Sequence, residues 1–155
     1  MAIEPHAVLT PVDGTFVPIE NVADPVFSQK MMGDGFAVAP AGDVVVAPVT
    51  GEVTAMYPTG HAYGLRTDDG AELIVHVGID TVAAGGGAFM PAVEKGQHVE
   101  VGDELVRFDR AILAERGFDV TVIVVATSLP EGSDIHGLVA AGETVEAGRT
   151  AVAEL

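Results

Sequence analysis

Residues 60–82 read GHAYGLRTDDGAELIVHVGIDTV and contain the clearest hairpin pattern in the chain. The segments HAYGLR and AELIVHV are rich in residues that favour strands, and TDDG between them has the composition of a tight turn. His61 lies in the first segment and His76 in the second. The stretch therefore predicts an antiparallel hairpin with one histidine on each side of its turn.

The length of this turn decides whether the two histidines meet. If Asp68 and Asp69 form a two-residue turn, His61 lies directly opposite His76, with Cβ atoms about 4.5–5.5 Å apart. If Asp69 and Gly70 form it, the two histidines are diagonal neighbours at roughly 7–8 Å. A loop with an odd number of residues would place the side chains on opposite faces. We therefore expect an even-length turn if the two imidazoles act together.

His76 interrupts an otherwise apolar strand, where a polar imidazole requires a partner or a purpose. Gly78 has no side chain and is expected to leave space beside His76 for another molecule. Asp80 follows on the same face, where its carboxylate can orient an imidazole or contact a cation. Three chemistries stay open: a zinc site of two histidines, an aspartate and a water, acid–base hydrolysis, and nucleophilic attack on phosphorus by one histidine while the other stabilises the phosphoryl oxygens.

The rest of the chain has the pattern of an all-β protein. Its 19 glycines and 9 prolines are scattered between short apolar or alternating segments, which is typical of a sandwich or barrel. Two internal similarities indicate duplicated β units. TPVDGTFVPI (10–19) is similar to APVTGEVTAM (47–56), and KGQHVEVGDEL (95–105) is similar to AGETVEAGRTA (141–151).

Helical patterns are sparse and short. RAILAERGF (110–118) predicts two turns that end at Gly117, and AFMPAVEKG (88–96) predicts one more. VTVIVVA (120–126) has the length of a buried strand. No linker divides the chain, so we expect one domain over residues 1–155.

Composition excludes several functions. The formal net charge of −16, from 23 acidic and 7 basic side chains, would repel nucleic acid. It suits either a basic protein partner or simply solubility or a salt-adapted source. The lack of cysteine excludes disulfides, thiolate zinc sites and cysteine nucleophiles. No apolar run approaches the roughly 18 residues of a membrane span, and the N-terminus has no targeting pattern. We therefore expect a cytoplasmic protein without direct membrane insertion, and Met1 together with the compact length favours a free-standing chain.

The hairpin stretch resembles the active-site segment of glucose-type enzyme IIA proteins of the bacterial sugar phosphotransferase system. In that family, an HA-aromatic motif precedes an HxGIDTV motif at the spacing found here. PVDGTFVPIENVADPVFSQKMMGDGFAVAPAGDVVVAPVTGEV (11–53) resembles the family's N-terminal half, and GQHVEVGDELVRFD (96–109) resembles its later turn. The resemblance spans about residues 8 to 152.

This resemblance implies an antiparallel β-sandwich with Greek-key and jelly-roll features, and a phosphotransferase component that needs no cofactor or metal. The HPr phosphocarrier protein would transfer a phosphoryl group to Nε2 of His76. A cysteine of a IIB domain, associated with a membrane IIC permease, would then receive it for sugar uptake. The resemblance implies that His61 hydrogen-bonds the phosphoryl group and that Thr59 orients the histidines.

The resemblance also assigns partner-binding residues. Asp24 and Asp80 match acidic residues that meet a basic residue on HPr. The family's apolar docking surface corresponds to Val26, Phe27, Met31 and Met32. The three other histidines match nothing active and are expected at the surface: His6, His98 and His136.

Two alternatives to a phosphocarrier remain. A two-histidine zinc hydrolase is one, although related zinc peptidases carry an HxH pair and a further His-x-x-x-Asp that this chain lacks. The other is a purely regulatory binding protein whose partners respond to phosphorylation of His76. The basic amphipathic N-terminal segment of some family members is also missing, so recruitment to a membrane by that route is not expected.

Overall fold

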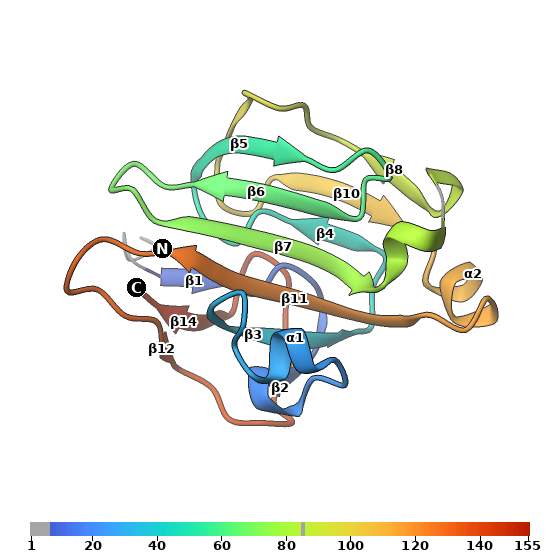
Figure 1. Ribbon diagram of the computed structural model, residues 1–155, viewed down its shortest axis with the longest axis horizontal. Coiled ribbons are helices and arrows are strands. Elements are labelled where there is room, and N and C mark those ends of the chain that lie inside the picture. Colours follow the sequence, from blue (N-terminus) through green and yellow to red (C-terminus); the bar gives the residue numbers. More distant parts are fainter. Residues whose placement is uncertain (1–6, 85) are drawn as a thin grey trace.

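The structure is a computed structural model that describes residues 7–84 and 86–155. Within these residues the strands form three antiparallel sheets (Figure 1). The largest contains, in spatial order, β13 (Thr144–Val145), β2 (Gly14–Pro18), β3 (Asp34–Pro40), β11 (Asp119–Ser128), β7 (Glu72–Ile79), β6 (Ala62–Arg66), β5 (Gly51–Met56) and β9 (His98–Val99). The two smaller sheets contain β1 (Ala7–Leu9), β14 (Ala151–Glu154) and β12 (His136–Gly137), and β4 (Val44–Val46), β10 (Glu104–Phe108) and β8 (Phe89–Pro91).

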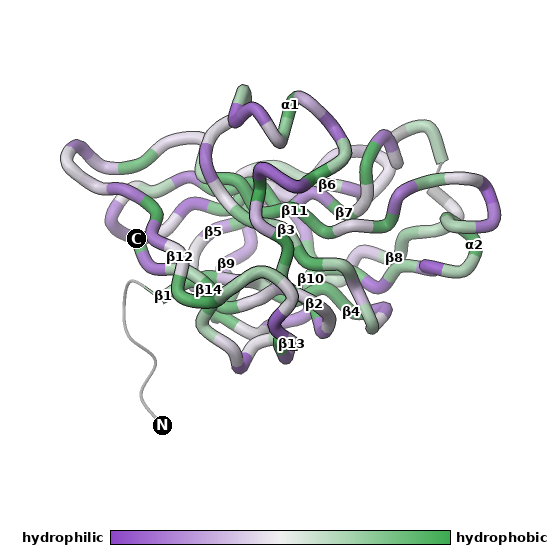
Figure 2. The backbone as a smooth tube through the Cα atoms, turned by 90° about the horizontal axis from the view of Figure 1, so that it is seen from below, coloured by the Kyte–Doolittle hydropathy of each residue, from purple (hydrophilic) through white to green (hydrophobic). Residues whose placement is uncertain are grey.

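The main core lies on one face of the large sheet. Its largest buried side chains come from all three sheets and include Val8, Phe36, Tyr63, Leu105 and Phe108. Viewed from below, the hydrophobic positions concentrate in the middle of the molecule, with α1 as a separate layer on the outside of β3 and β11 (Figure 2). The predicted antiparallel β-sandwich is therefore confirmed.

A second, smaller core cluster lies on the opposite face of the large sheet, under residues 19–32. It consists of Ile19, Val22, Phe27, Ala37, Ile79, Ile123 and Val125. Along β7, Val75 and Val77 belong to the main core, whereas Ile74 packs against the second cluster. The strand is thus covered on both faces, which explains its nearly continuous apolar run.

The covering layer is built from η1 (Ile19–Asn21) and the short helix α1 (Pro25–Ser28). Asp24 is the N-cap of α1: its Oδ1 accepts a hydrogen bond from the backbone N of Val26 at 2.8 Å. Pro25 occupies the first helical position, which has no need of a backbone donor. A single helical turn is therefore fixed above the sheet by local sequence.

The prediction of a helix over 110–118 is confirmed by α2 (Arg110–Glu115), after which Gly117 has a φ of +86°. The predicted helix over 88–96 is wrong, because Phe89 is buried and its strand β8 pairs with β10. Two short 3-10 turns precede β8, η2 (Thr81–Ala84) and η3 (Gly86–Ala88). No helix in residues 7–84 and 86–155 has the length and hydropathy to cross a membrane.

The segments that resemble each other in the sequence form the same pair of strands twice in the structure. The strand from the first copy, β2, pairs with β13, and the corresponding strand from the second copy, β5, pairs with β9. The registers are equivalent: Gly14↔Val145 and Thr15↔Thr144 in one copy, Gly51↔Val99 and Glu52↔His98 in the other. This equivalence supports the interpretation of the similarities as a duplicated β unit.

Candidate functional site: the histidine pair

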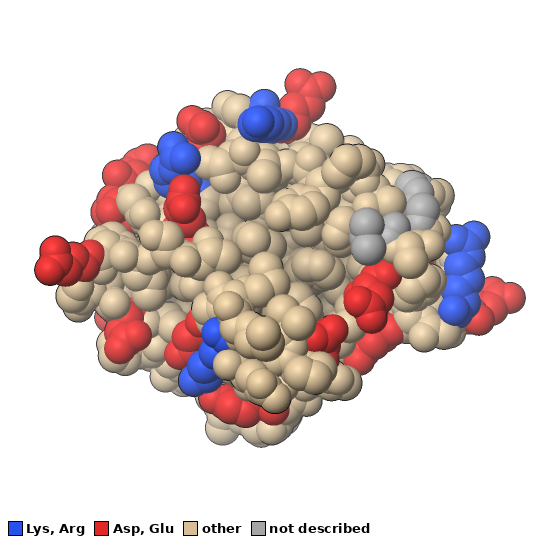
Figure 3. Space-filling model, viewed as in Figure 1, with Lys and Arg blue, Asp and Glu red and all other residues tan. Residues whose placement is uncertain are grey.

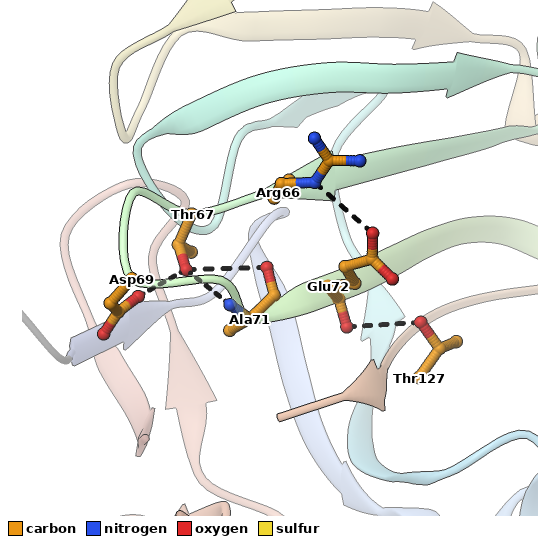
Figure 4. Close-up of polar contacts among 6 residues, drawn as sticks. All are labelled: Arg66, Thr67, Asp69, Ala71, Glu72 and Thr127. Atoms are coloured by element: carbon orange, nitrogen blue, oxygen red, sulfur yellow. Dashed lines mark hydrogen bonds and ion pairs between the residues drawn. The ribbon is translucent and has the colours of Figure 1, made fainter. Parts of the chain in front are cut away.

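The loop between β6 and β7 is odd in length, contrary to the expected even-length turn. Arg66 pairs with Glu72 in the sheet, and the side chains of the two residues are 3.4 Å apart (Figure 4). The backbone N of Thr67 donates to the carbonyl of Ala71 at 2.9 Å. The loop proper therefore has three residues, 68–70, and the even-length prediction is wrong.

Thr67 and Gly70 together select this three-residue loop. The backbone N of Gly70 donates to the carbonyl of Thr67 at 3.1 Å, and Gly70 has a φ of +92°. A β-turn followed by a left-handed glycine is the usual form of a three-residue hairpin loop. The Thr67 hydroxyl adds two contacts, donating to Asp69 Oδ1 at 2.5 Å and accepting from the Ala71 backbone N at 3.0 Å. These contacts are drawn in Figure 4.

The two histidines nevertheless meet. In this register His76 pairs with Ala62, so strict alternation would turn His61 toward the main core. However, the ring centroids of His61 and His76 are 5.1 Å apart, with the planes at 73°. His61 lies in a bend before β6, directly after Gly60, whose φ is +79°. Its carbonyl still accepts from the backbone N of Val77 at 2.6 Å, but its side chain is free of strand alternation.

The environment of His76 fixes the position of its proton. Its Nδ1 is 2.6 Å from the carbonyl oxygen of Gly78. A carbonyl can only accept, so Nδ1 carries the hydrogen, and the lone pair of the neutral ring is on Nε2. The ring of Phe27 packs edge-on against the imidazole, with centroids 5.4 Å apart. His76 is therefore half-buried, with its ring fixed by these two contacts and its lone pair on Nε2.

His61 is more deeply buried, with only 4% of its surface exposed. Its Nδ1 is 2.6 Å from the hydroxyl oxygen of Thr59. The ring of Tyr57 packs edge-on on its other side, with centroids 5.5 Å apart. Tyr57 is a site residue that the sequence analysis missed; an aromatic residue at the end of a strand just before TGH was the available signal.

Burial lowers the pKa of both imidazoles. Loss of solvent lowers the pKa of His61 to about 4, and the nearby His76 contributes in the same direction. Burial also lowers the pKa of His76, against the opposing effects of the Gly78 carbonyl, Asp24 and Asp80. Both rings are therefore neutral at pH 7, which is the state that nucleophilic attack requires.

The structure brings Asp24 and Asp80 close enough to act on the charge of His76. Asp80 follows the end of β7 with a φ of +59°, and its side chain is exposed. The two carboxylates thus come from separate segments, one from the covering layer and one from the large sheet. Figure 3 shows the molecule with uncharged residues over most of the centre of this view and charged residues, mostly Asp and Glu with a few Lys and Arg, around the margin.

The apolar residues of the expected docking surface divide into two groups. Val26 is 40% exposed and Met31 is 69% exposed. Phe27 is only 5% exposed and belongs to the second core cluster, so its prediction as a surface residue is wrong. Met32 is half-buried against the same cluster. The physical reason is helix geometry, since α1 turns Phe27 inward onto the sheet while Val26 points outward.

The expectation that Gly78 leaves open space for another molecule is wrong. Gly78 is buried with a φ of +81°. A Cβ at this position would lie 2.4 Å from Cγ2 of Thr81 and 3.0 Å from the carbonyl oxygen of Asp119. Gly78 is required because the backbone passes through a left-handed conformation in a filled space, where its carbonyl can reach His76.

Gly78→Ala is expected to lower the free energy of unfolding by about 2–4 kcal/mol, from a left-handed alanine and the clash with Thr81. Chemical denaturation measures this loss. Gly70→Ala is the matched control: its φ is +92°, but no atom lies within 4 Å of the added Cβ, so it should cost only about 1 kcal/mol. Equal losses in the two variants would show that Thr81 moves aside without cost.

The lowered pKa of His61 predicts a pH dependence of stability. Below its ordinary pKa of 6.5 the unfolded histidine binds a proton, whereas the folded one stays neutral down to about pH 4. The unfolded state therefore binds more protons in this window, and the free energy of unfolding falls by about 3 kcal/mol as the pH drops from 6.5 to 4. Denaturation of wild type and His61→Gln is measured across this range. The difference between the two proteins gives the pH-dependent contribution of His61 to the free energy of unfolding. Parallel pH curves for the two proteins would contradict it.

Among residues 7–84 and 86–155, no group of three or more His, Cys, Asp or Glu side chains is placed to hold a metal ion. The zinc hydrolase alternative therefore lacks a third ligand in this part of the chain. His98 and His136 are exposed, as expected, and His98 lies 3.1 Å from Glu100. His6 lies outside the described residues.

The fold and the site together define a class: a β-sandwich protein in which a half-buried, neutral histidine with its lone pair on Nε2 lies beside a second, buried histidine. The comparisons with known proteins make this class specific. Residues 6–132 match the family model of the phosphoenolpyruvate-dependent sugar phosphotransferase system, EIIA 1. The chain belongs to this family and is therefore a component of a sugar phosphotransferase system.

Individual relatives of the chain belong to the same family. A glucose-specific EIIA component of the phosphotransferase system from Halalkalibacterium halodurans is 46% identical over 124 residues, 80% of this chain and 72% of the relative. One from Staphylococcus aureus is 43% identical over 130 residues, 84% of this chain and 78% of the relative. The solved structure of glucose permease IIA from Mycoplasma capricolum matches with a TM-score of 0.87 at 35% identity, over 95% of this chain and 93% of that one. Neither alternative function finds support in these relatives.

Proposed function

We propose that this chain relays a phosphoryl group from HPr to a IIB domain, with Nε2 of His76 as the carrying atom. The hydrogen bond between His76 Nδ1 and the Gly78 carbonyl, 2.6 Å long, is the observation that carries this proposal. It holds the proton on Nδ1 and leaves Nε2 free to form a bond to phosphorus.

In the first step the Nε2 lone pair of His76 attacks the phosphorus of phospho-HPr. The new N–P bond forms as the N–P bond to the HPr imidazole breaks, and the electron pair of that bond returns to the HPr ring. Positive charge develops on the His76 ring as the bond forms. The Gly78 carbonyl and the carboxylates of Asp24 and Asp80 stabilise that charge, as their effects on the His76 pKa indicate.

His61 is proposed to hold the phosphoryl oxygens. If the Thr59 hydroxyl donates to Nδ1 of His61, the imidazole hydrogen is on Nε2, where it can be donated to a phosphoryl oxygen. The hydroxyl oxygen of Thr59 lies 2.6 Å from Nδ1 of His61, within the distance of such a bond. In the second step a IIB cysteine thiolate attacks phosphorus, an S–P bond forms, and the electron pair of the broken N–P bond returns to His76.

The partner face is proposed to surround the histidine pair. Val26 and Met31 offer exposed apolar surface on the covering layer, and Tyr57 is 41% exposed beside His61. Asp24 and Asp80 supply negative charge near His76, where a basic residue of HPr can pair with them. An apolar centre with a charged rim is the usual composition of a transient protein interface. As part of this proposal we place the chain in the cytoplasm, near a IIC permease but without insertion of its own.

Reconstitution with phosphoenolpyruvate, the first enzyme of the system and HPr tests this function. One phosphoryl group should be incorporated, stable to base and labile to acid. Nitrogen and phosphorus NMR should assign it to Nε2 of a histidine. Incorporation at Nδ1, or no incorporation into the folded protein, would refute the proposal.

A further inference from the structure

Lys30 has a backbone conformation that lysine rarely adopts. Its φ is +58°, in the left-handed region that favours glycine. It follows the C-cap residue Gln29 of α1; its backbone N donates to the carbonyl of Phe27 at 2.9 Å, and that of Met31 donates to Val26 at 3.0 Å. This pair of bonds is the Schellman motif, in which the position of Lys30 is usually glycine.

The side chain of Lys30 joins two segments that are apart in the sequence. Its Nζ is 3.4 Å from Oε1 of Glu20, in η1, and 3.5 Å from Oδ1 of Asp34, at the start of β3. Both carboxylates raise the pKa of Lys30, with Asp34 having the larger effect. A glycine would adopt this backbone without strain but would form neither ion pair.

This ion-pair triad lies beside a cavity of about 240 Å³. The cavity is lined by apolar side chains of the main sandwich, including Phe16, Phe36, Ile135 and Val152, and by all three charged residues of the triad. The pocket is half-open and lies at the edge of the main sandwich, where residues 19–30 meet side chains of the main core. The ion pairs of Lys30 join η1 to the start of β3 at the margin of this pocket.

The segment that Lys30 restrains carries the groups that act on His76. Residues 20–34 include Asp24, which acts on the charge of His76, and Phe27, whose ring contacts its imidazole. They also include the exposed Val26 and Met31. A shift of this segment would move the charge, the ring contact and the docking surface together.

We propose that Lys30 is a positioning residue: its ion pairs to Glu20 and Asp34 hold the covering layer so that Phe27 contacts His76 and Val26 and Met31 face the partner. The proposal rests on the proposed relay function for its kinetic consequence. Its structural consequence, the Phe27–His76 contact, does not depend on phosphoryl transfer.

Four variants test it. Lys30→Gly removes the ion pairs and the backbone strain, Lys30→Met removes the ion pairs and keeps the strain, and Lys30→Arg keeps both. Lys95→Gly is the matched control, because Lys95 is the other lysine of the chain and lies exposed in the turn before Gly96. For each variant we would measure the melting temperature, the KM and kcat for phosphoryl uptake from phospho-HPr, and the NMR shifts and titration of His76.

Lys30→Gly should melt at or above the wild-type temperature and yet show a KM raised about threefold, with kcat less affected. The ring-current shift of Phe27 on His76 should shrink. Lys30→Met should show the same kinetic change with a lower melting temperature, whereas Lys30→Arg and Lys95→Gly should behave as wild type. A wild-type KM and Phe27–His76 contact in Lys30→Gly would overturn the proposal, as would a KM change that only follows a loss of stability. Failure of the wild type to accept a phosphoryl group would instead refute the relay function, and the NMR measurements would still decide the role of Lys30.

Discussion

Replacing His76 with alanine is expected to abolish phosphoryl uptake from phospho-HPr, with a loss of about 10⁴-fold or more. The variant has no nucleophilic atom at the position where Nε2 stands. His61 cannot substitute, because it is 4% exposed and, in the proposed tautomer, its Nδ1 lone pair faces Thr59 while its Nε2 carries the hydrogen. Transfer of labelled phosphate from phosphoenolpyruvate, measured by quench flow, gives the rate.

The control for this variant is His136→Ala, which removes an exposed histidine far along the sequence and should leave uptake unchanged. Circular dichroism and melting of His76→Ala establish that the fold survives the loss of the Phe27 contact. His76→Gln, which preserves more of the side-chain volume, should be equally inactive. Uptake of one phosphoryl group by either folded His76 variant would assign the carrier atom to another residue.

The sequence predicts the pairing of strands better than it predicts the placement of side chains. Glycine turns and alternating segments identify a β-sandwich because each is a local property, and the two internal similarities predict equivalent strand pairs. The turn after β6 shows the limit. A stretch such as TDDG is compatible with loops of two or three residues, and the choice depends on the hydroxyl of Thr67 and the left-handed Gly70.

Burial in the second core cluster is not readable from local sequence. Phe27 directly follows the exposed Val26 in the sequence, and only the docking of α1 on the sheet turns Phe27 inward onto His76. Gly78 is similar, because the atoms that fill its side-chain position come from Thr81 and from Asp119 on the neighbouring strand β11. Histidine spacing identifies the site, while the packing that makes it work comes from long-range contacts.

The duplicated β unit explains why the site forms where it does. In one copy, β2 continues into the covering layer that carries Asp24 and Phe27. In the other, β5 continues into the turn that carries Tyr57, Thr59 and His61. The strand β7 lies between the two copies in the large sheet and carries His76. The site is thus assembled where extensions from equivalent strands reach the same central strand from opposite sides.

His61→Gln is expected to separate the two halves of the relay. Uptake from phospho-HPr should continue at a near-normal rate, because it requires the Nε2 lone pair of His76 and a neutral attacking imidazole. Onward transfer to the IIB cysteine should fall about 10²–10³-fold, since one donor to the phosphoryl oxygens is lost. The second step is more sensitive because a negatively charged thiolate must approach a negatively charged phosphoryl group. The Nε2–H of His61 reduces this repulsion by donating to a phosphoryl oxygen. A bound phosphoryl group would also raise the pKa of His61 from about 4.

Single-turnover measurements with isolated IIB distinguish this role from a general disturbance of the site. Thr59→Val is the companion variant, because it keeps the imidazole of His61 and removes the hydroxyl 2.6 Å from its Nδ1. It should slow onward transfer by about tenfold through loss of the favoured tautomer, which is less than the loss in His61→Gln. Both variants should be phosphorylated fully and retain the group for longer than wild type in the presence of IIB. Unimpaired onward transfer in His61→Gln would show that His76 presents the phosphoryl group without help from its neighbour.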